Sequence, residues 1–368
     1  MISLWAALAV LNRMDTILLF APALLVAILQ PVATPTRVAR KLGAVALGFS
    51  PLILWLLFST VYYGFPYPNT ACAKLNTGVA RSDLVRQGLA YLSNSIRMDP
   101  LTLPVIGAGI LVAAFKRTAE QVSMALGILS YLAYTVAIGG DFMSGRFLSV
   151  PLIGSVILIC ASGYVTSKRA LLPALAMALL IGLASPHAPI YSRWDAGLDM
   201  QIPDLIDEDG ICDERLFYYR ATGWLTADGI RRSPDLSWWS QKAAEYSGQP
   251  VVLQCVIGIY GYYIAPRSHI VDHCAALVDP LLARLPTRDV KSWRIGHFER
   301  IVPGGYLETL AGGSNTISDA ALAQFYDRLS LITRGDVFTT DRFITIWRMN
   351  AGQYNALLRT SSYVSSGP

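Results

Sequence analysis

The sequence predicts an α-helical polytopic membrane domain of about six spans, followed by a mixed α/β extracytoplasmic domain. Long apolar stretches fill the first half and are absent from the second. Charge divides the chain at the same place. Residues 1–189 hold 13 Lys and Arg against 5 Asp and Glu, a net of +8, whereas residues 190–368 hold 17 against 20, a net of −3. Such asymmetry predicts two domains, 1–189 and 190–368.

The spans follow from hydropathy, because a membrane helix needs roughly 17–25 mostly apolar residues. Two of the stretches that qualify are slightly short, which a small tilt tolerates. The predicted spans are 15–30, 42–62, 101–115, 119–138, 147–165 and 170–185.

Basic residues fix the predicted orientation. They collect in three connections that lie on one side: Arg37, Arg40 and Lys41; Lys116 and Arg117; Lys168 and Arg169. The positive-inside rule makes that side the cytoplasm. The loop 63–100, the turn around Asp141 and everything after Ser185 are then outside. Since the basic excess lies beside apolar spans, it sets topology and does not suggest nucleic acid.

The first 30 residues are apolar except for Asn12, Arg13 and Asp15. A single helix of that length would measure roughly 45 Å, too long for one straight span. We therefore expect two short helices that meet at residues 12–15. The orientation also starts Met1 on the wrong side, so we expect the membrane domain to be N-terminally incomplete.

Further elements follow from periodicity. Leu84, Leu89, Leu92 and Ile96 predict an amphipathic helix at 81–97 that lies on the membrane surface. In the second half we expect a buried strand at 250–259, a helix at 318–333 capped by Ser318, and a strand at 341–348, where apolar residues alternate.

Three cysteines lie in the second half, at Cys212, Cys255 and Cys274. An oxidising compartment allows one disulfide with one thiol left over. Buried free thiols are the alternative, and the spacing decides neither.

Two charged pairs interrupt or border the spans. An ionisable residue at such a depth is costly unless it is paired or solvated, so it is a functional hypothesis. Arg13 and Asp15 either serve a site or form an ion pair that fixes two short helices. The hairpin 139–146 combines three glycines with Asp141 and Arg146. Glycines allow close approach of a ligand and an arginine fork binds phosphate, which a plain polar turn explains less well.

Other polar groups favour structural interpretations. An acidic run suits a solvated loop better than a metal site, because it lacks the spacing of a calcium loop; it comprises Asp204, Asp207, Glu208, Asp209, Asp213 and Glu214. His269, Asp272 and His273 resemble surface or core residues more than catalysts. The aromatic stretch 217–239 could stack on sugars or form core.

Several motifs together resemble a known family. They are Asn12-Arg13-Met14-Asp15, Tyr63-Gly64 with Pro68-Asn69-Thr70 and Ala73-Lys74, the hairpin Gly139-Gly140-Asp141-Phe142-Met143-x-Gly145-Arg146, and, in the second half, Asp272, Asp279-Pro280, Ala283-Arg284, Trp293-Arg294-x-Gly296-His297 and Arg300. This combination resembles polytopic bacterial glycosyltransferases of the GT-C superfamily, and most of all the mycobacterial terminal β-(1→2)-arabinofuranosyltransferase family.

The resemblance implies an enzyme of the bacterial cytoplasmic membrane. Such an enzyme transfers a sugar, here expected to be arabinofuranose, from a polyprenyl-phosphate donor to a cell-envelope glycan. The implied donor-side residues are Arg146, Asp141, Arg13, Asp15, Asn69 and Lys74, with Arg146 on the phosphate. The implied acceptor-side residues are Asp272, Arg284, Arg294, His297 and Arg300. A carboxylate in the first outer loop is the expected general base, and that loop would precede Met1.

No cofactor is required by this chemistry, although a divalent cation is compatible with it. The implied partners are the lipid-linked donor, the glycan acceptor and the bilayer, without nucleic acid. Two other functions stay open: a non-catalytic membrane-anchored protein that binds glycan or a partner, and a transporter or flippase, against which the lack of an evident repeat counts.

Overall fold

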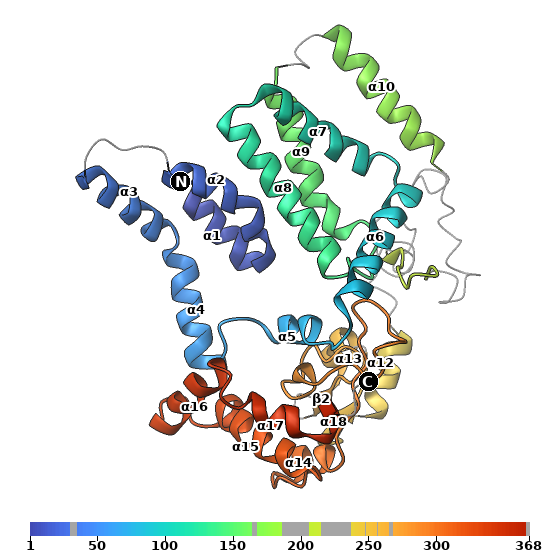
Figure 1. The fold of residues 1–368 in the computed structure, drawn as a ribbon. Coiled ribbons are helices and arrows are strands. Elements are labelled where there is room, and N and C mark those ends of the chain that lie inside the picture. Colours follow the sequence, from blue (N-terminus) through green and yellow to red (C-terminus); the bar gives the residue numbers. More distant parts are fainter. Residues whose placement is uncertain are drawn as a thin grey trace. The chain divides into compact units, whose positions relative to one another are not determined.

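The computed structural model describes residues 1–29, 35–163, 168–185, 206–214, 237–246, 248–255, 257–264 and 268–365. It is mostly helical, and the chain divides into two compact units (Figure 1). Unit 1 comprises Met1–Trp55 and Arg81–Arg220, and unit 2 comprises Leu56–Ala80 and Ala221–Pro368. The grouping of Leu56–Ala80 with the C-terminal part is a feature that no sequence pattern indicated. The domain boundary at residue 189 stays a prediction.

Unit 1 is a set of packed helices. Their bounds are α1 Ile2–Asn12, the 3₁₀ turn η1 Met14–Thr16, α2 Ile17–Leu29, α3 Pro35–Gly48, the start of α4 Ser50–Tyr63, α6 Arg81–Met98, α7 Thr102–Lys116, α8 Ala119–Ala137, the 3₁₀ turn η2 Arg146–Leu148, α9 Ser149–Ala161 and α10 Lys168–Ala184. Helices occupy all six predicted apolar stretches, and the predicted break between two short helices at residues 12–15 is confirmed.

Taken singly, none of the described helices combines the length and hydropathy of a membrane span. Two consecutive pairs meet that criterion jointly: the α3 segment Val38–Gly48 with α4, bent by 52°, and α6 with α7, bent by 107°. Proline accounts for both bends, because Pro51 and Pro100 each remove a backbone N–H donor and crowd the preceding turn.

The core of unit 1 lies between α6, α7, α8 and α9. It contains Tyr91, Ile106, Ile128, Tyr131 and Leu158, each almost fully buried. Helix α2 joins this group by packing on α8. A Cβ atom at Gly127 of α8 would collide with the carbonyl oxygen of Leu19 in α2, so only glycine permits this close approach.

The predicted helix at 81–97 is confirmed as α6, but its predicted apolar face is only partly buried. Tyr91, Asn94 and Ser95 are buried, whereas Leu89 and Ile96 are each 56% exposed. Leu89 and Ile96 are therefore turned away from the protein core, whereas Leu92 packs partly against it.

Unit 2 is formed by short helices around one apolar core. Its elements are α5 Asn69–Leu75, α12 Ser237–Glu245, β1 Val251–Leu253, α13 Ile257–Tyr263, β2 His269–Val271, the 3₁₀ turn η5 Leu282–Arg284, α14 Tyr306–Gly312, α15 Ala320–Arg334, α16 Thr340–Asn350, α17 Asn355–Thr360 and α18 Ser362–Ser365. Strands β1 and β2 pair in parallel, with Val251 opposite His269.

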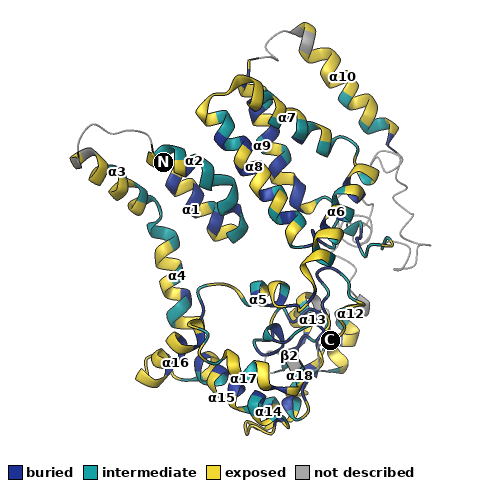
Figure 2. Cartoon of the chain, in the orientation of Figure 1, coloured by how far each residue is buried: buried dark blue, intermediate teal, exposed yellow. Residues whose placement is uncertain are grey.

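Leu322, Phe325, Leu329 and Ile332 give α15 a buried stripe at helical spacing (Figure 2). The predicted helix at 318–333 is thus confirmed, but the residue that caps it is Asp319, whose carboxylate accepts from the Leu322 amide at 2.8 Å. Ser318 as the cap was wrong.

Two strand predictions need correction. The strand predicted at 250–259 extends only over β1, and α13 begins at Ile257. The strand predicted at 341–348 was wrong, since these residues lie in α16. Among the described residues of this unit, the β part of the predicted mixed α/β class is a single two-stranded sheet.

Candidate functional site

The hairpin between α8 and η2 is attached to α6 by Tyr91 and by Asn94, which accepts from the Ser144 hydroxyl at 2.7 Å. The Tyr91 hydroxyl donates to the carbonyl oxygen of Met143 at 3.2 Å and accepts from the amide of Phe147 at 3.0 Å. Gly140 has a φ of +71°, and a Cβ atom there would lie against the Tyr91 ring. The glycine at 140 therefore has a structural cause, a positive φ and an aromatic ring beside the backbone, where the sequence had suggested the approach of a ligand.

Asp141 and Arg146 form a two-point ion pair across this hairpin. Arg146 Nη2 donates to Asp141 Oδ1 at 2.7 Å, and Arg146 Nε lies 2.5 Å from Asp141 Oδ2. The Asp141 side chain is only 2% exposed, whereas that of Arg146 is 38% exposed. A buried carboxylate thus fixes the plane of a partly exposed guanidinium, whose Nη1 also donates to the Met143 sulfur at 2.9 Å.

Arg13 and Asp15 form a second pair with the same two-point geometry. Arg13 Nη2 lies 2.6 Å from Asp15 Oδ2, and Arg13 Nε lies 3.1 Å from Oδ1. The Tyr131 hydroxyl, from α8, donates to Asp15 at 3.4 Å. Here too the carboxylate is the more buried member, at 11% exposure against 35% for the arginine.

One aromatic ring, that of Phe147, lies beside both arginines. The Arg13 Cζ atom is 4.4 Å from the ring centroid and the Arg146 Cζ atom is 6.0 Å from it. Both distances permit a cation–π contact. We refer to Arg13, Asp15, Asp141, Arg146 and Phe147 as the Phe147 cluster. Phe147, unlike the four charged residues, was missed by the sequence reasoning, although its place directly after Arg146 was a usable signal.

The two carboxylates of the Phe147 cluster do not suit a divalent cation as they stand. Asp15 accepts from Nε and Nη2 of Arg13, and Asp141 accepts from Nη2 of Arg146 while Nε lies beside its other oxygen. A positive guanidinium thus lies against the oxygens that a cation would need.

The described part of the acidic run folds as a hydrogen-bonded loop against α6. Asp207 accepts from the amides of Asp209 and Ile211 at 3.0 and 2.9 Å, and from Asn94 Nδ2 at 2.8 Å. The loop also joins the hairpin, since the Cys212 amide donates to the carbonyl oxygen of Phe142 at 2.7 Å. The Asp207 oxygens therefore serve local structure. Asp204 and most of the aromatic stretch 217–239 lie outside the described residues.

Asn69, predicted on the donor side, lies in unit 2 beside Arg284. Its Nδ2 donates to the carbonyl oxygens of Ala276, Leu277 and Asp279 at 3.1–3.2 Å, and its Oδ1 accepts from Arg284 at 3.3 Å. Asn69 thereby holds the turn before η5. Burial lowers the pKa of Arg284.

Asp279, a buried carboxylate in the same turn, accepts from the Tyr306 hydroxyl and from the Leu281 and Leu282 amides. Burial raises its pKa despite these donors.

Asp272 and Arg300, predicted on the acceptor side, are both buried. Asp272 accepts from the amides of Ala275 and Leu277 at 3.1 and 2.9 Å, which fixes the turn after β2. Arg300 donates to the carbonyl oxygen of Ala73 at 2.7 Å, and burial lowers its pKa to about 10. Their roles toward a substrate stay predictions.

Lys74 from the predicted donor side and Arg294 and His297 from the predicted acceptor side are brought together in unit 2. Burial lowers the pKa of His297, and the positive charges of Arg294 and Lys74 lower it further. Burial and these two positive charges therefore disfavour protonation of the imidazole. This cluster could bind an anionic or hydroxyl-rich group, and that role is a prediction.

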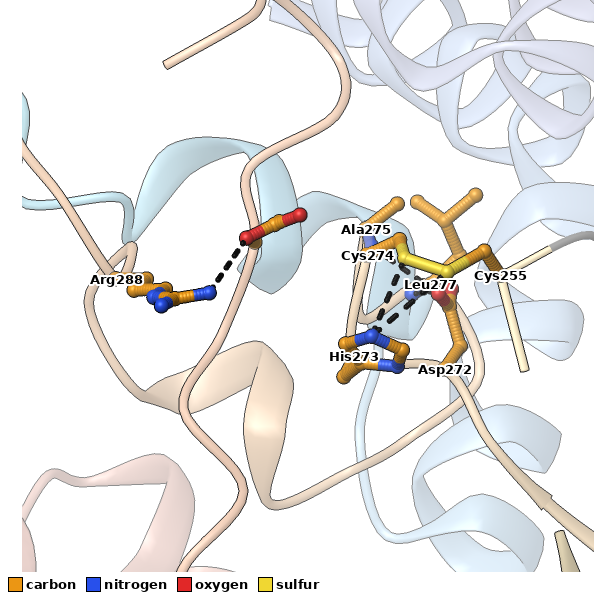
Figure 3. Close-up of a disulfide and its surroundings, with 8 residues drawn as sticks. Cys255, Asp272, His273, Cys274, Ala275, Leu277 and Arg288 are labelled. Carbon is orange, nitrogen blue, oxygen red and sulfur yellow. Dashed lines mark hydrogen bonds and ion pairs between the residues drawn. A yellow bond between two sulfur atoms is a disulfide. The ribbon is translucent and has the colours of Figure 1, made fainter. Parts of the chain in front are cut away.

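A disulfide joins Cys255 and Cys274 (Figure 3). Cys212 is a buried free thiol. Of the two arrangements that the sequence left open, the structure therefore has the one with a disulfide and one leftover thiol. The His273 Nε2 atom lies 3.8 and 3.6 Å from the two disulfide sulfurs. These three residues are close enough to hold a metal ion, but disulfide sulfurs are not the thiolates that bind one.

Burial lowers the pKa of His269, and Arg334 adds to the effect.

Comparison with known proteins yields one informative similarity. The chain is similar to the terminal β-(1→2)-arabinofuranosyltransferase of Mycobacterium tuberculosis, with 29% identity over 233 residues. That match covers 53% of this chain and 35% of the mycobacterial protein, so the chain spans about a third of its relative. No protein-family model matches, and no solved structure matches. The chain therefore has a distant, partial relative that is a glycosyltransferase.

Proposed function

We propose that this chain is a membrane glycosyltransferase, or part of one, that transfers a sugar from a polyprenyl-phosphate donor to a cell-envelope glycan. The observation that supports the proposal most directly is the Phe147 cluster. It presents two oriented guanidinium groups beside one ring, and in both ion pairs the arginine is the more exposed member.

The chemistry of the donor fits this arrangement. A polyprenyl phosphosugar is a phosphodiester with one negative charge, and its phosphate leaves with the lipid when the anomeric carbon is attacked. Arginine forks bind phosphate oxygens at two points and stabilise the charge that develops on them. Arg146 is the proposed phosphate ligand and Arg13 its second contact, while Asp141 and Asp15 hold the two guanidinium groups in place.

The acceptor is proposed to reach the site from outside the membrane. Lys74, Arg294 and His297 of unit 2 are the proposed glycan-binding groups, and the predicted orientation places unit 2 outside the cytoplasm. No described residue is assigned as the general base. Arabinofuranose is the proposed sugar because the mycobacterial relative is named for its transfer.

The test is sugar transfer by the full-length protein in native membranes, with a radiolabelled polyprenyl-phosphate arabinofuranose donor. Arg146→Ala should abolish transfer while membrane insertion is unchanged. Arg86→Ala is the matched control, because Arg86 belongs to the same unit but its side chain is 83% exposed; it should transfer at the wild-type rate.

Retained transfer in Arg146→Ala would remove Arg146 from the donor site. Wild-type protein that binds the donor and the glycan but never transfers the sugar would refute the enzyme and support the membrane-anchored binding protein instead.

A further inference from the structure

Helix α16 has two apolar faces, of which the described part of the chain buries one. Ile346 and Met349 are buried in the core of unit 2, at a spacing of three residues. The remaining surface carries Phe343 at 40% exposure, Ile344 at 43% and Trp347 at 74%. Much of α16 has the colour of exposed residues in Figure 2. Phe343 and Trp347 are four residues apart and therefore neighbours on the helix surface. Phe338, just before the helix, is 84% exposed. We call Phe338, Phe343, Ile344 and Trp347 the α16 apolar face.

This face is joined rigidly to the end of α4. The Arg342 guanidinium, on the buried side of α16, donates to the carbonyl oxygens of Val61 and Tyr62 at 2.7 and 2.8 Å. Those carbonyls belong to the last turn of α4, where the helix itself offers no partner. Asn350, at the other end of α16, donates to the carbonyl oxygen of Gly64 at 2.8 Å. Both contacts lie within unit 2.

The end of α4 has the composition of a membrane boundary. Phe58, Tyr62 and Tyr63 pack ring against ring there, with centroids 4.9–6.1 Å apart, and each is about half exposed. Aromatic residues are enriched where a span meets the headgroups, because this layer lies between apolar acyl chains on one side and water on the other. Helix α4 is also half of a bent pair whose length and hydropathy suffice for a span.

We propose that the α16 apolar face docks on the lipid bilayer, with its aromatic side chains at the depth of the headgroups. The inference rests on the membrane location in the proposed function. The aromatic group at the end of α4 and the α16 apolar face belong to two helices that hydrogen bonds hold together. The membrane boundary that the α4 aromatic group meets is therefore also the surface that the α16 apolar face meets. Arg348, exposed on α16, adds a cation suited to lipid phosphate.

Docking of this kind would hold unit 2 close to the membrane surface, where a lipid-linked donor presents its sugar. It buries aromatic surface without a spanning segment, as amphipathic helices at interfaces do. The polar and charged residues that flank the face do not oppose this placement, because side chains at headgroup depth keep their contact with water.

The experiment is spin-label accessibility in the full chain, reconstituted in vesicles of phosphatidylcholine and phosphatidylglycerol. Cys160→Ser removes the exposed free thiol, while Cys72 and Cys212 are buried and stay. Labels at Phe338→Cys and at Trp347→Cys report the face. A label at Arg328→Cys, exposed on α15, is the matched aqueous control. Because all three positions are exposed, the variants should melt as the wild type does.

We expect the labels at 338 and 347 to collide more often with oxygen than with a water-soluble nickel chelate, and the label at 328 to show the reverse. A water-like result at 338 and 347 overturns the proposal, and protection from both reagents overturns it in favour of a second protein copy. A fourth label, at Leu54→Cys on α4, separates the two hypotheses: if it too is water-like, the membrane location fails, and with it the proposed function.

Discussion

Arg342→Met should destabilise unit 2 strongly, because this arginine caps two helices from inside the protein. The guanidinium donates to Val61 and Tyr62 at the end of α4, to Ile332 in the last turn of α15, and to Val337. The residue is 1% exposed, and burial lowers its pKa. Methionine keeps the length of the side chain but supplies no donor.

The magnitude follows from the carbonyls left behind. A buried polar group without a partner costs about 1–3 kcal/mol. Four carbonyls lose a donor, but solvent and relaxation recover part of that cost, so we expect a loss of about 3–5 kcal/mol, as for a broken buried charge network. For a unit of this size each kcal/mol shifts Tm by about 2–4 °C. The expected fall in Tm is therefore about 6–20 °C.

The assay is thermal unfolding of the full chain in detergent, followed by near-ultraviolet circular dichroism. Arg348→Met is the matched control, since Arg348 lies on the exposed side of the same helix and such surface changes usually fall within about 0.5 kcal/mol. Equal melting temperatures for the two variants would show that the buried hydrogen bonds of Arg342 contribute nothing measurable, and the reasoning would fail.

Two further predictions concern the candidate sites. Phe147→Leu removes the ring beside Arg13 and Arg146 but keeps an apolar side chain. The loss of two cation–π contacts, about 1–2 kcal/mol, should weaken donor binding roughly 5- to 30-fold. Unchanged binding in a donor titration would contradict this prediction. For His297 the lowered pKa means that the unfolded chain takes up the proton more readily. The stability it contributes is present above about pH 6.5 and is lost as pH falls through the lowered value. His297→Gln should therefore reduce the drop in Tm between pH 7.5 and 5.5, and an equal drop would argue against this assignment.

The helices of unit 1 could be predicted because hydropathy over 15 to 20 residues depends little on the rest of the chain. The secondary structure of α16 could not. Ile344 and Ile346 alternate with polar residues, which fits a strand, whereas the buried positions Arg342, Ile346 and Met349 follow the spacing of a helix. In so short a window both periods match, and the packing of Arg342 on distant carbonyls decides between them.

The buried face of α6 shows a second limit of sequence patterns. The leucines predicted a helix correctly, but its most buried side is the one with Tyr91 and Asn94, and of the predicted apolar face Leu92 packs partly on the core. Tyr91 is held by the hairpin and Asn94 by Asp207, which is 113 residues away in sequence. Amphipathicity indicates that a helix has two faces, and only the partners show which face meets the core.

The site itself was predictable where its contacts are local. Arg13 pairs with a carboxylate two residues away and Arg146 with one five residues away, so charge pattern alone suggested both pairs. Their meeting at Phe147 depends on how η1 and η2 pack within unit 1, which a one-dimensional pattern does not contain.

In each of the two ion pairs, the partner that is more exposed indicates the function of the pair. If each pair only joined two short helices or closed a turn, either partner could be the buried one. In both, the carboxylate is the shielded member and the guanidinium the accessible one, at 2% against 38% for Asp141 and Arg146 and at 11% against 35% for Asp15 and Arg13. The carboxylates balance charges that would be expensive to hold alone among apolar helices. Both guanidinium groups stay partly exposed beside Phe147, although one nitrogen of Arg146 also donates to the Met143 sulfur. A phosphodiester, with one negative charge and two free oxygens, matches that surface better than a neutral sugar or a cation does.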